Sequence, residues 1–216
     1  MKKILLAGLM LAAACAARAE DVQRPVLLVA APDLQGLYSR TTLLVVPAAG
    51  GQHLGFILNR ATDVKLATLF PYHAPSAKVA DPVYFGGPEM IESIFAIVRR
   101  DPGGPALRLF GELYVTGNAA EVDRIIEQTP NEARYFAGFV GWRPGELAKE
   151  LEAGYWLVTE PDEKLPFRKE TGEMWEELVE RLQPRAPMLQ TRLEARGPRL
   201  RGGDFLQAFP SSAAAL

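Results

Sequence analysis

Residues 138–158 have the sequence GFVGWRPGELAKELEAGYWLV, which predicts a strand, a helix and a second strand joined by tight turns. Large and small apolar residues alternate from 136 to 140, which suits a strand buried on both faces. Pro144 fits the first turn of a helix, where its missing N–H costs no hydrogen bond. Gly154 fits a left-handed cap just past the helix. The second strand is expected at 155–159.

Apolar and β-branched runs elsewhere in the chain predict further strands. These runs lie at 26–31, 41–46, 54–58, 83–85, 94–98, 107–110 and 113–116. Amphipathic periodicity predicts a helix at 119–128, capped by Asn118, a second at 171–182 and a short one at 64–70. Because 216 residues with 48% hydrophobic content suffice for one sizeable core, we expect a single α/β domain over residues 20–183.

The first nineteen residues have the pattern of an export signal peptide. Lys2 and Lys3 give a positive start, and the apolar run that follows is too short to span a membrane as a mature helix. Ala17-Arg18-Ala19 is a small-residue cleavage pattern, so we expect cleavage after Ala19 and a periplasmic or secreted mature protein. A buried N-terminal helix is the alternative.

Cys15 is the one cysteine of the chain, and it offers a second form of export through a lipid anchor. Lipoprotein signals usually have leucine three residues before the cysteine, whereas that position is Ala12 here and Leu11 lies one step too far. We therefore favour simple cleavage over an anchored lipoprotein. The body after Cys15 has no cysteine, which excludes a disulfide, a thiol nucleophile and a zinc–thiolate site there. No transmembrane segment is expected in the mature chain.

The charge of the chain is unevenly distributed. Of its 24 lysines and arginines, three lie in residues 1–19 and five in residues 184–216, which leaves 16 between them. The same middle region contains 24 of the 26 acidic residues, so its net charge is −8. An acidic body repels nucleic acid, and a nucleic-acid partner is therefore not expected. Residues 184–216 are rich in Arg, Pro and Gly, which predicts a disordered tail.

The sequence lacks the motifs of the common catalytic and cofactor sites. It contains no H-E-x-x-H, no G-x-S-x-G and no phosphate-binding P-loop. The two histidines, His53 and His73, lie in separate segments, and a lone histidine is more often a turn or surface residue than a ligand. We therefore expect no catalytic residue, no cofactor and no metal site.

Three local features each have a functional and a structural interpretation. Glu146 and Glu150 lie four apart, where they could serve acid–base chemistry, bind a hard cation or form a solvated helix face. The Gly86-Gly87 pair could present backbone N–H groups to an anion or only allow a sharp turn. Trp142 could line a ligand cleft or belong to the core.

Several short motifs occur in a fixed order along the chain. They are Asn59-Arg60 after the strand at 54–58, Gly86-Gly87-Pro88, Gly138-Phe-Val-Gly141-Trp142, Gly145-Glu-Leu, Glu150 and Trp156. Each motif alone is weak, but their order and spacing over roughly residues 26–182 resemble the YqgE/AlgH family of bacterial proteins.

The resemblance implies an α/β domain with a bent, mixed β-sheet that curls toward a pseudo-barrel, with helices packed outside. The family is often labelled as transcriptional regulators, but no established reaction or cofactor accompanies it, so no catalytic residue is carried over. The motif positions form the candidate ligand-binding surface. They are Asn59, Arg60, Gly86, Gly87, Pro88, Gly141, Trp142 and Glu150.

The chain also departs from the family pattern. Ala61 stands where a proline usually follows Asn-Arg, and Glu89 stands where a small apolar residue usually follows Gly-Gly-Pro. Family members generally lack a leader. An exported acidic domain does not meet the chromosome, so the regulator label does not suit this chain.

These observations together predict an exported binding or regulatory protein that recognises an unidentified protein or small molecule. Arg60 and the backbone around Gly86 would supply polar contacts, and Trp142 an apolar wall. Two alternatives stay open. One is an uncharacterised hydrolase that uses Glu146 or Glu150 as its base, and the other is a cytosolic regulator associated with DNA.

Overall fold

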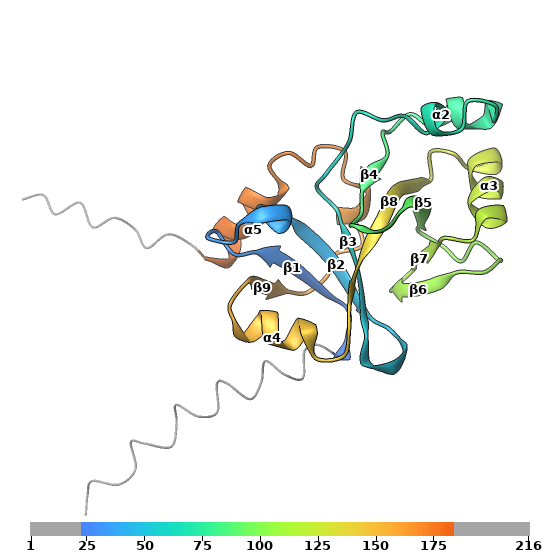
Figure 1. Cartoon of the computed structure of the whole chain (residues 1–216). Helices are drawn as coiled ribbons and strands as arrows, with labels where there is room; N and C mark the ends of the chain where they lie inside the picture. The colour runs from blue at the N-terminus through green and yellow to red at the C-terminus, as the bar shows by residue number, and fades with distance from the viewer. Residues whose placement is uncertain (1–22, 184–216) are drawn as a thin grey trace, which may run out of the picture. The chain divides into compact units, whose positions relative to one another are not determined.

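The computed structural model of the chain describes residues 23–183 (Figure 1). The leader predicted at 1–19 and the tail predicted at 184–216 lie outside the described residues. Nine strands and four α-helices make up the described part, and none of its helices is long and apolar enough to span a membrane. This mixture of strands and helices confirms the predicted α/β class.

The elements follow one another as Figure 1 labels them. The strands are β1 (Val26–Ala30), β2 (Thr42–Pro47), β3 (His53–Ile57), β4 (Tyr84–Phe85), β5 (Glu89–Val98), β6 (Leu107–Phe110), β7 (Leu113–Thr116), β8 (Ala133–Trp142) and β9 (Trp156–Thr159). The α-helices are α2 (Leu66–Leu69), α3 (Ala119–Gln128), α4 (Glu146–Glu152) and α5 (Met174–Leu182). Short 3-10 turns are η2 (Gly36–Tyr38), η3 (Ala49–Gly51), η4 (Ala74–Lys78) and η5 (Leu165–Phe167).

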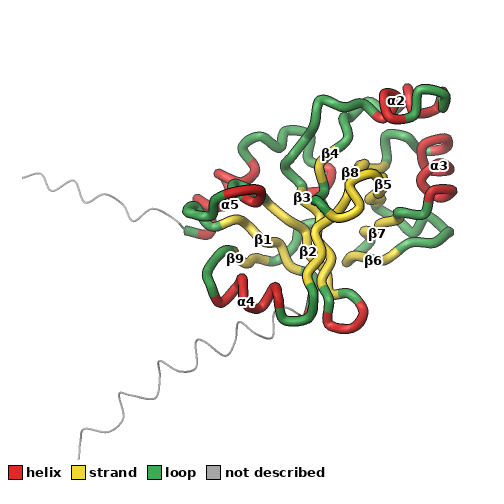
Figure 2. The backbone as a smooth tube through the Cα atoms, in the orientation of Figure 1, coloured by secondary structure: helices red, strands yellow, loops and turns green. Residues whose placement is uncertain are grey.

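All nine strands join one sheet in the order β6-β7-β5-β8-β3-β2-β1-β9, with β4 paired to β8 off this path. β4 runs parallel to β8, whereas the other strand pairs are antiparallel. The strands near β1 and those near β6 run in different directions in Figure 2, because the sheet curls. The predicted bent, mixed sheet with helices packed against it is confirmed.

The sheet bends along β8. Residues 133–137 of this strand pair with β5, and two of them also pair with β4. Phe139 pairs with Glu89 at the start of β5, and residues 140–142 pair with β3. Gly138 lies between these two halves with a φ of +68°, in the left-handed region that favours glycine. A Cβ on Gly138 would lie 2.3 Å from the carbonyl oxygen of Gly87, so this position has no room for a side chain.

Three elements begin three or more residues away from the starts that the sequence pattern predicts. β5 begins earlier, because residues 89–93 are mostly exposed and contain a register shift that hides the strand alternation. β8 also begins earlier and includes Arg134, which is only 2% exposed because its guanidinium stacks 4.3 Å from the centre of the Tyr84 ring. α5 begins later, at Met174, because residues 172–173 form a turn.

Three helices each cover a separate apolar cluster on the sheet. α5 contributes Met174 and Leu178 to the first cluster, and α4 contributes Leu147 to the second. The third contains Val122 and Ile125 of α3. The amphipathic faces predicted from the sequence therefore pack on the sheet.

Candidate functional site

The loop between β1 and β2 is held by the two polar residues that follow β3. The backbone N–H of Thr42 donates to Asn59 Oδ1 at 2.9 Å, and Asn59 Nδ2 donates to the carbonyl of Arg40 at 2.9 Å. Arg60 Nη2 donates to the carbonyl of Ser39 at 3.1 Å. The predicted Asn59-Arg60 pair therefore fixes a loop that no sequence motif singles out.

Glu150 holds two tryptophans together. Its Oε2 atom accepts a hydrogen bond from Trp142 Nε1 at 2.9 Å and another from Trp156 Nε1 at 2.7 Å. Both tryptophans are buried, with 5% and 6% of their surface exposed. A buried indole N–H without an acceptor is unfavourable, and a carboxylate is a stronger acceptor than a neutral group. Glu150 therefore ties α4 to β8 and β9.

Tyr38 packs against this arrangement from the β1–β2 loop. Its ring meets the ring of Trp156 edge-on, with 6.0 Å between the ring centres. Burial raises the pKa of Tyr38 above its ordinary value, and the negative charges of Glu150 and Glu89 raise it further. The phenol therefore lies near two carboxylates. We call the surface formed by Tyr38, Arg60, Glu89 and Glu150 the Tyr38 face.

The Gly86-Gly87 pair packs backbone to backbone against its neighbours. The Gly86 N–H donates to the carbonyl of Ala137 at 2.9 Å, and the Gly86 carbonyl accepts from the N–H of Ile57 at 2.9 Å. A Cβ on Gly87 would lie 2.2 Å from the carbonyl oxygen of Phe139. The Gly86 N–H is therefore already used inside the sheet, and the polar contact expected from it is not free for a ligand.

The eight predicted residues differ in how deeply they are buried. Gly86, Gly87 and Trp142 are buried, Asn59, Arg60 and Glu150 are partly buried, and Pro88 and Gly141 are exposed. Because Trp142 is buried, it supports the site from the core and does not form the expected exposed wall. Glu150 of the Tyr38 face was predicted, whereas Tyr38 and Glu89 were missed, since Tyr38 belongs to no motif and Glu89 stood out only as a departure from the family pattern.

The two acidic residues of the predicted hydrolase alternative both have structural partners. Glu146 Oε2 accepts the backbone N–H of Arg143 at 2.8 Å, at the start of α4. Glu150 accepts the two indole N–H groups. A general base needs a carboxylate oxygen within reach of the proton that it removes, so these contacts favour the structural interpretation of both glutamates.

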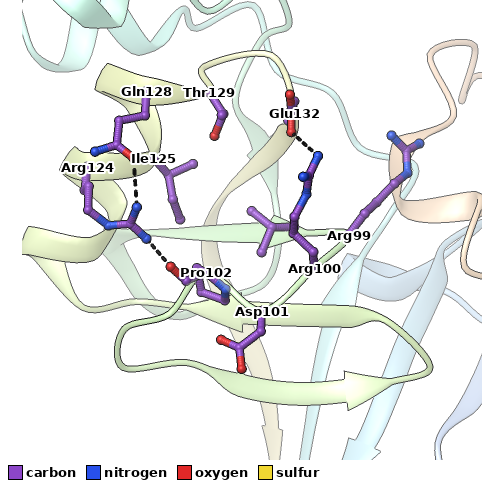
Figure 3. Close-up of a pocket in the computed structure, with 10 residues that line it drawn as sticks. Arg99, Arg100, Asp101, Pro102, Arg124, Ile125, Gln128, Thr129 and Glu132 are labelled. Carbon is purple, nitrogen blue, oxygen red and sulfur yellow. Dashed lines mark hydrogen bonds and ion pairs between the residues drawn. The ribbon is translucent and has the colours of Figure 1, made fainter.

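A hollow of about 360 Å³ lies away from the Tyr38 face, between the end of β5 and α3 (Figure 3). Its three arginines have partners in the described structure. Arg124 donates to Gln128 and to the carbonyl of Pro102, Arg100 donates to Glu132, and the Arg99 guanidinium stacks on Phe167. The three guanidinium groups are thus engaged by groups of the protein itself, and we do not assign an anion site to this hollow.

A third group of polar side chains has the composition of a metal site. His73 precedes η4, and Asp123 and Glu127 lie on α3; one ligand atom from each lies within 4.8 Å of the others. No sequence pattern predicts this group, because its histidine is distant in sequence from the two acids, and the spacing of the acids alone is common on solvated helices.

Replacing Glu150 tests its role in joining the two tryptophans. Glu150→Ala leaves two buried indole N–H groups without an acceptor, and we expect it to lower the free energy of unfolding by about 2–4 kcal/mol. Glu150→Gln keeps an acceptor oxygen and should cost about 1 kcal/mol. Urea unfolding followed by tryptophan fluorescence measures both. Glu152→Ala, an exposed change on the same helix, is the control, and equal stability of the two alanine variants would refute the role.

The environment of Tyr38 predicts how its hydroxyl ionises. Negative charge on Glu89 disfavours the phenolate, so Glu89→Gln should lower the pKa of Tyr38 toward its ordinary value of 10.0. The difference in ultraviolet absorbance between each protein and its Tyr38→Phe derivative isolates this titration. Glu152→Gln should leave the curve unchanged. If Glu89→Gln also leaves it unchanged, the Glu89 carboxylate does not face the phenol.

Comparison with known proteins identifies the fold. A model of the AlgH-like family matches residues 27–186. A UPF0301 protein of Chlorobium limicola is 29% identical over 188 residues, which cover 84% of this chain and 96% of that protein. A UPF0301 protein of Chlorobium chlorochromatii is 31% identical over 157 residues, which cover 71% of this chain and 82% of that protein.

Solved structures show the same architecture. The solution structure of the AlgH protein from Pseudomonas aeruginosa has a TM-score of 0.63 at 22% identity, and the match covers 74% of this chain and 88% of that one. A crystal structure of a Corynebacterium diphtheriae protein has a TM-score of 0.60 at 24% identity, with 77% and 88% covered. The resemblance drawn from the ordered motifs is thereby confirmed. Since the family model spans most of its length, the chain belongs to the AlgH-like family, together with the UPF0301 proteins.

Proposed function

We propose that this chain is an exported, non-catalytic binding protein that recognises a positively charged group of its partner through the Tyr38 face. The observation that carries the proposal is the position of the Tyr38 phenol. It is half-buried against Trp156, and the carboxylates of Glu89 and Glu150 both act on it. Segments that are far apart in the sequence converge on this one side chain.

An aromatic ring beside two carboxylates suits a cationic ligand. Ammonium and guanidinium groups are attracted both to carboxylates and to the faces of aromatic rings. The net charge of −8 over residues 20–183 would also draw a basic partner toward the domain. Glu89 is exposed and replaces the small apolar residue that the family pattern favours, so it gives this chain a charge of its own at the site.

Binding fits the contacts of the site better than hydrolysis does. Glu146 and Glu150 already accept hydrogen bonds from the backbone and from the indoles. One oxygen of each carboxylate is thereby engaged in holding the fold, which favours a structural role over acid–base catalysis. The rigid attachment of the β1–β2 loop by Asn59 and Arg60 supports recognition, because a preformed surface loses less entropy on binding.

The N-terminal pattern of residues 1–19 supports export. An exported protein does not meet the chromosome, so export argues against the role of a DNA-associated regulator. The acidic charge of the domain opposes it as well, since duplex binding depends on neutralising phosphates with lysine and arginine. A lipid anchor at Cys15 would place the domain on a membrane surface, and it would leave the Tyr38 face unchanged.

Export predicts a defined N-terminus for the protein isolated from its native host. Cleavage after Ala19 would leave Glu20 as the first residue of protein recovered from outside the cytoplasm. Fractionation with N-terminal sequencing or intact-mass measurement checks this expectation. A lipid-modified Cys15 would support the anchored form of export. Cytoplasmic protein that begins at Met1 would overturn the proposal, and the regulator would then be tested by duplex binding across a salt series.

Recognition of a cation predicts selective binding of basic peptides. On an array of peptides that vary in charge, the chain should prefer Lys- and Arg-rich sequences. Glu89→Gln, which removes a carboxylate, and Tyr38→Leu, which removes the aromatic ring, should each weaken that binding about tenfold. Glu180→Gln removes one acid from an exposed position on α5 and serves as the matched control. A preference for acidic peptides, or equal weakening by Glu180→Gln, would reject the Tyr38 face as the binding surface.

A further inference from the structure

A histidine and two carboxylates from separate parts of the chain meet beside α3. His73 lies between α2 and η4, where its backbone precedes the first residue of η4. Asp123 and Glu127 are four residues apart on α3 and therefore lie on one face of this helix. One ligand atom from each of the three lies within 4.8 Å of the others. This group is separate from the Tyr38 face and shares no residue with it.

The imidazole of His73 is held in a defined orientation. Its Nδ1 atom is 2.7 Å from the hydroxyl oxygen of Ser76, which is buried with 1% of its surface exposed. Metal-binding histidines commonly use one ring nitrogen for such a bond and present the other to the ion. The Ser76 contact therefore aims Nε2 at the carboxylates of α3.

The Nε2 atom faces Asp123 without forming a hydrogen bond to it. It is buried and makes no hydrogen bond, although Asp123 Oδ1 lies only 3.1 Å away. When Nδ1 donates to Ser76, the neutral ring turns an Nε2 lone pair toward a carboxylate oxygen. Two such electron-rich atoms repel each other unless a proton or a metal cation lies between them. The competing explanation is a proton on Nε2. It is present in the other neutral tautomer, in which Nδ1 accepts from the Ser76 hydroxyl, and in a charged imidazolium that pairs with Asp123.

The separation of the two atoms suits a shared metal ion. Zinc binds histidine nitrogen and carboxylate oxygen at about 2.0–2.2 Å in tetrahedral geometry, so two of its ligand atoms lie roughly 3.3 Å apart. The 3.1 Å between His73 Nε2 and Asp123 Oδ1 is close to this value. Glu127 is exposed, and rotation of its side chain can bring a carboxylate oxygen to the third position.

The same residues line a cavity. His73 and Asp123 are part of the wall of a hollow of about 390 Å³, together with Phe70, Glu92, Ile94 and Val122. An ion held at the wall by three protein ligands would keep a fourth position for water or a small ligand. This open position distinguishes reactive and ligand-binding zinc sites from closed structural ones, which use four protein ligands.

We propose that His73, Asp123 and Glu127 bind one divalent transition-metal ion, for which Zn²⁺ is the best fit, with Ser76 positioning the histidine and a fourth coordination position open to the cavity. One imidazole and two carboxylates suit Zn²⁺ better than Ca²⁺ or Mg²⁺, which prefer all-oxygen sites. This assignment replaces the absence of a metal site expected from the sequence. It does not depend on the cation-binding function of the Tyr38 face.

The test is titration of the EDTA-treated full chain with Zn²⁺ in a calorimeter. We expect one ion per chain with a dissociation constant in the micromolar range or tighter. His73→Gln and Asp123→Asn should each weaken binding by at least about 100-fold, since even partners outside the coordination sphere alter affinity by 10–100-fold. Ser76→Ala should weaken Zn²⁺ binding by about 10–100-fold, because Ser76 contacts the histidine and not the ion. Cobalt provides a second readout, because four-coordinate Co²⁺ absorbs strongly in the visible and would lose this band in the ligand variants.

Two control variants keep the result interpretable. Cys15→Ser should leave the affinity unchanged, which excludes the thiol as the ligand, and so should Glu152→Gln on α4. Circular dichroism checks that each variant is folded; Asp123 is 57% exposed, so its change to asparagine is compatible with folding. Zn²⁺ binding weaker than about 1 mM, or binding that both His73→Gln and Asp123→Asn leave unchanged, overturns the proposal and leaves an ion pair between His73 and Asp123.

Discussion

The structure depends on the close contact between the Gly86-Gly87 backbone and β8 at Gly138. A Cβ on Gly86 would lie 2.3 Å from the carbonyl oxygen of Gly138, and a Cβ on Gly138 would lie 2.3 Å from the carbonyl oxygen of Gly87. These distances admit only glycine. Because the backbones can approach, β8 bends at Gly138; all but one of its pairs with β5 lie before the bend, and its pairs with β3 lie after it. One strand thereby belongs to both ends of the curled sheet.

The contacts around Glu150 follow from this bend. After β8 has turned toward β3, it ends at Trp142. On that side of β8 the sheet continues through β3 to β2, β1 and β9. α4 then lies between Trp142 and Trp156, and its one central carboxylate satisfies both indoles. Tyr38 packs on the outside of Trp156 from the loop that Asn59 and Arg60 fasten. The position of the Tyr38 face therefore follows from the bend of β8, and a few surface side chains give the face its charge.

The sequence predicts most of this fold but little of the site. The helix at 119–128 has the bounds and the Asn118 cap that its pattern predicts, because capping and amphipathic spacing are local signals. The early starts of β5 and β8 escape prediction, since an exposed bulge and the buried Arg134 break the alternation. The residues of the two candidate sites come together only through tertiary packing, which no local pattern encodes. This applies to Tyr38 with Glu89 and to His73 with Asp123.

The family motifs themselves are largely accounted for by the architecture. Asn59 and Arg60 fasten a loop, Gly86 and Gly87 allow two backbones to meet, and Glu150 joins two buried tryptophans. A residue that the fold requires carries little information about a ligand, and proteins of one fold can differ in function. Residues that would distinguish this chain must therefore lie outside the motifs. Glu89 at the Tyr38 face and His73 beside α3 both lie outside the motifs, and each has side-chain chemistry that a ligand or an ion can use.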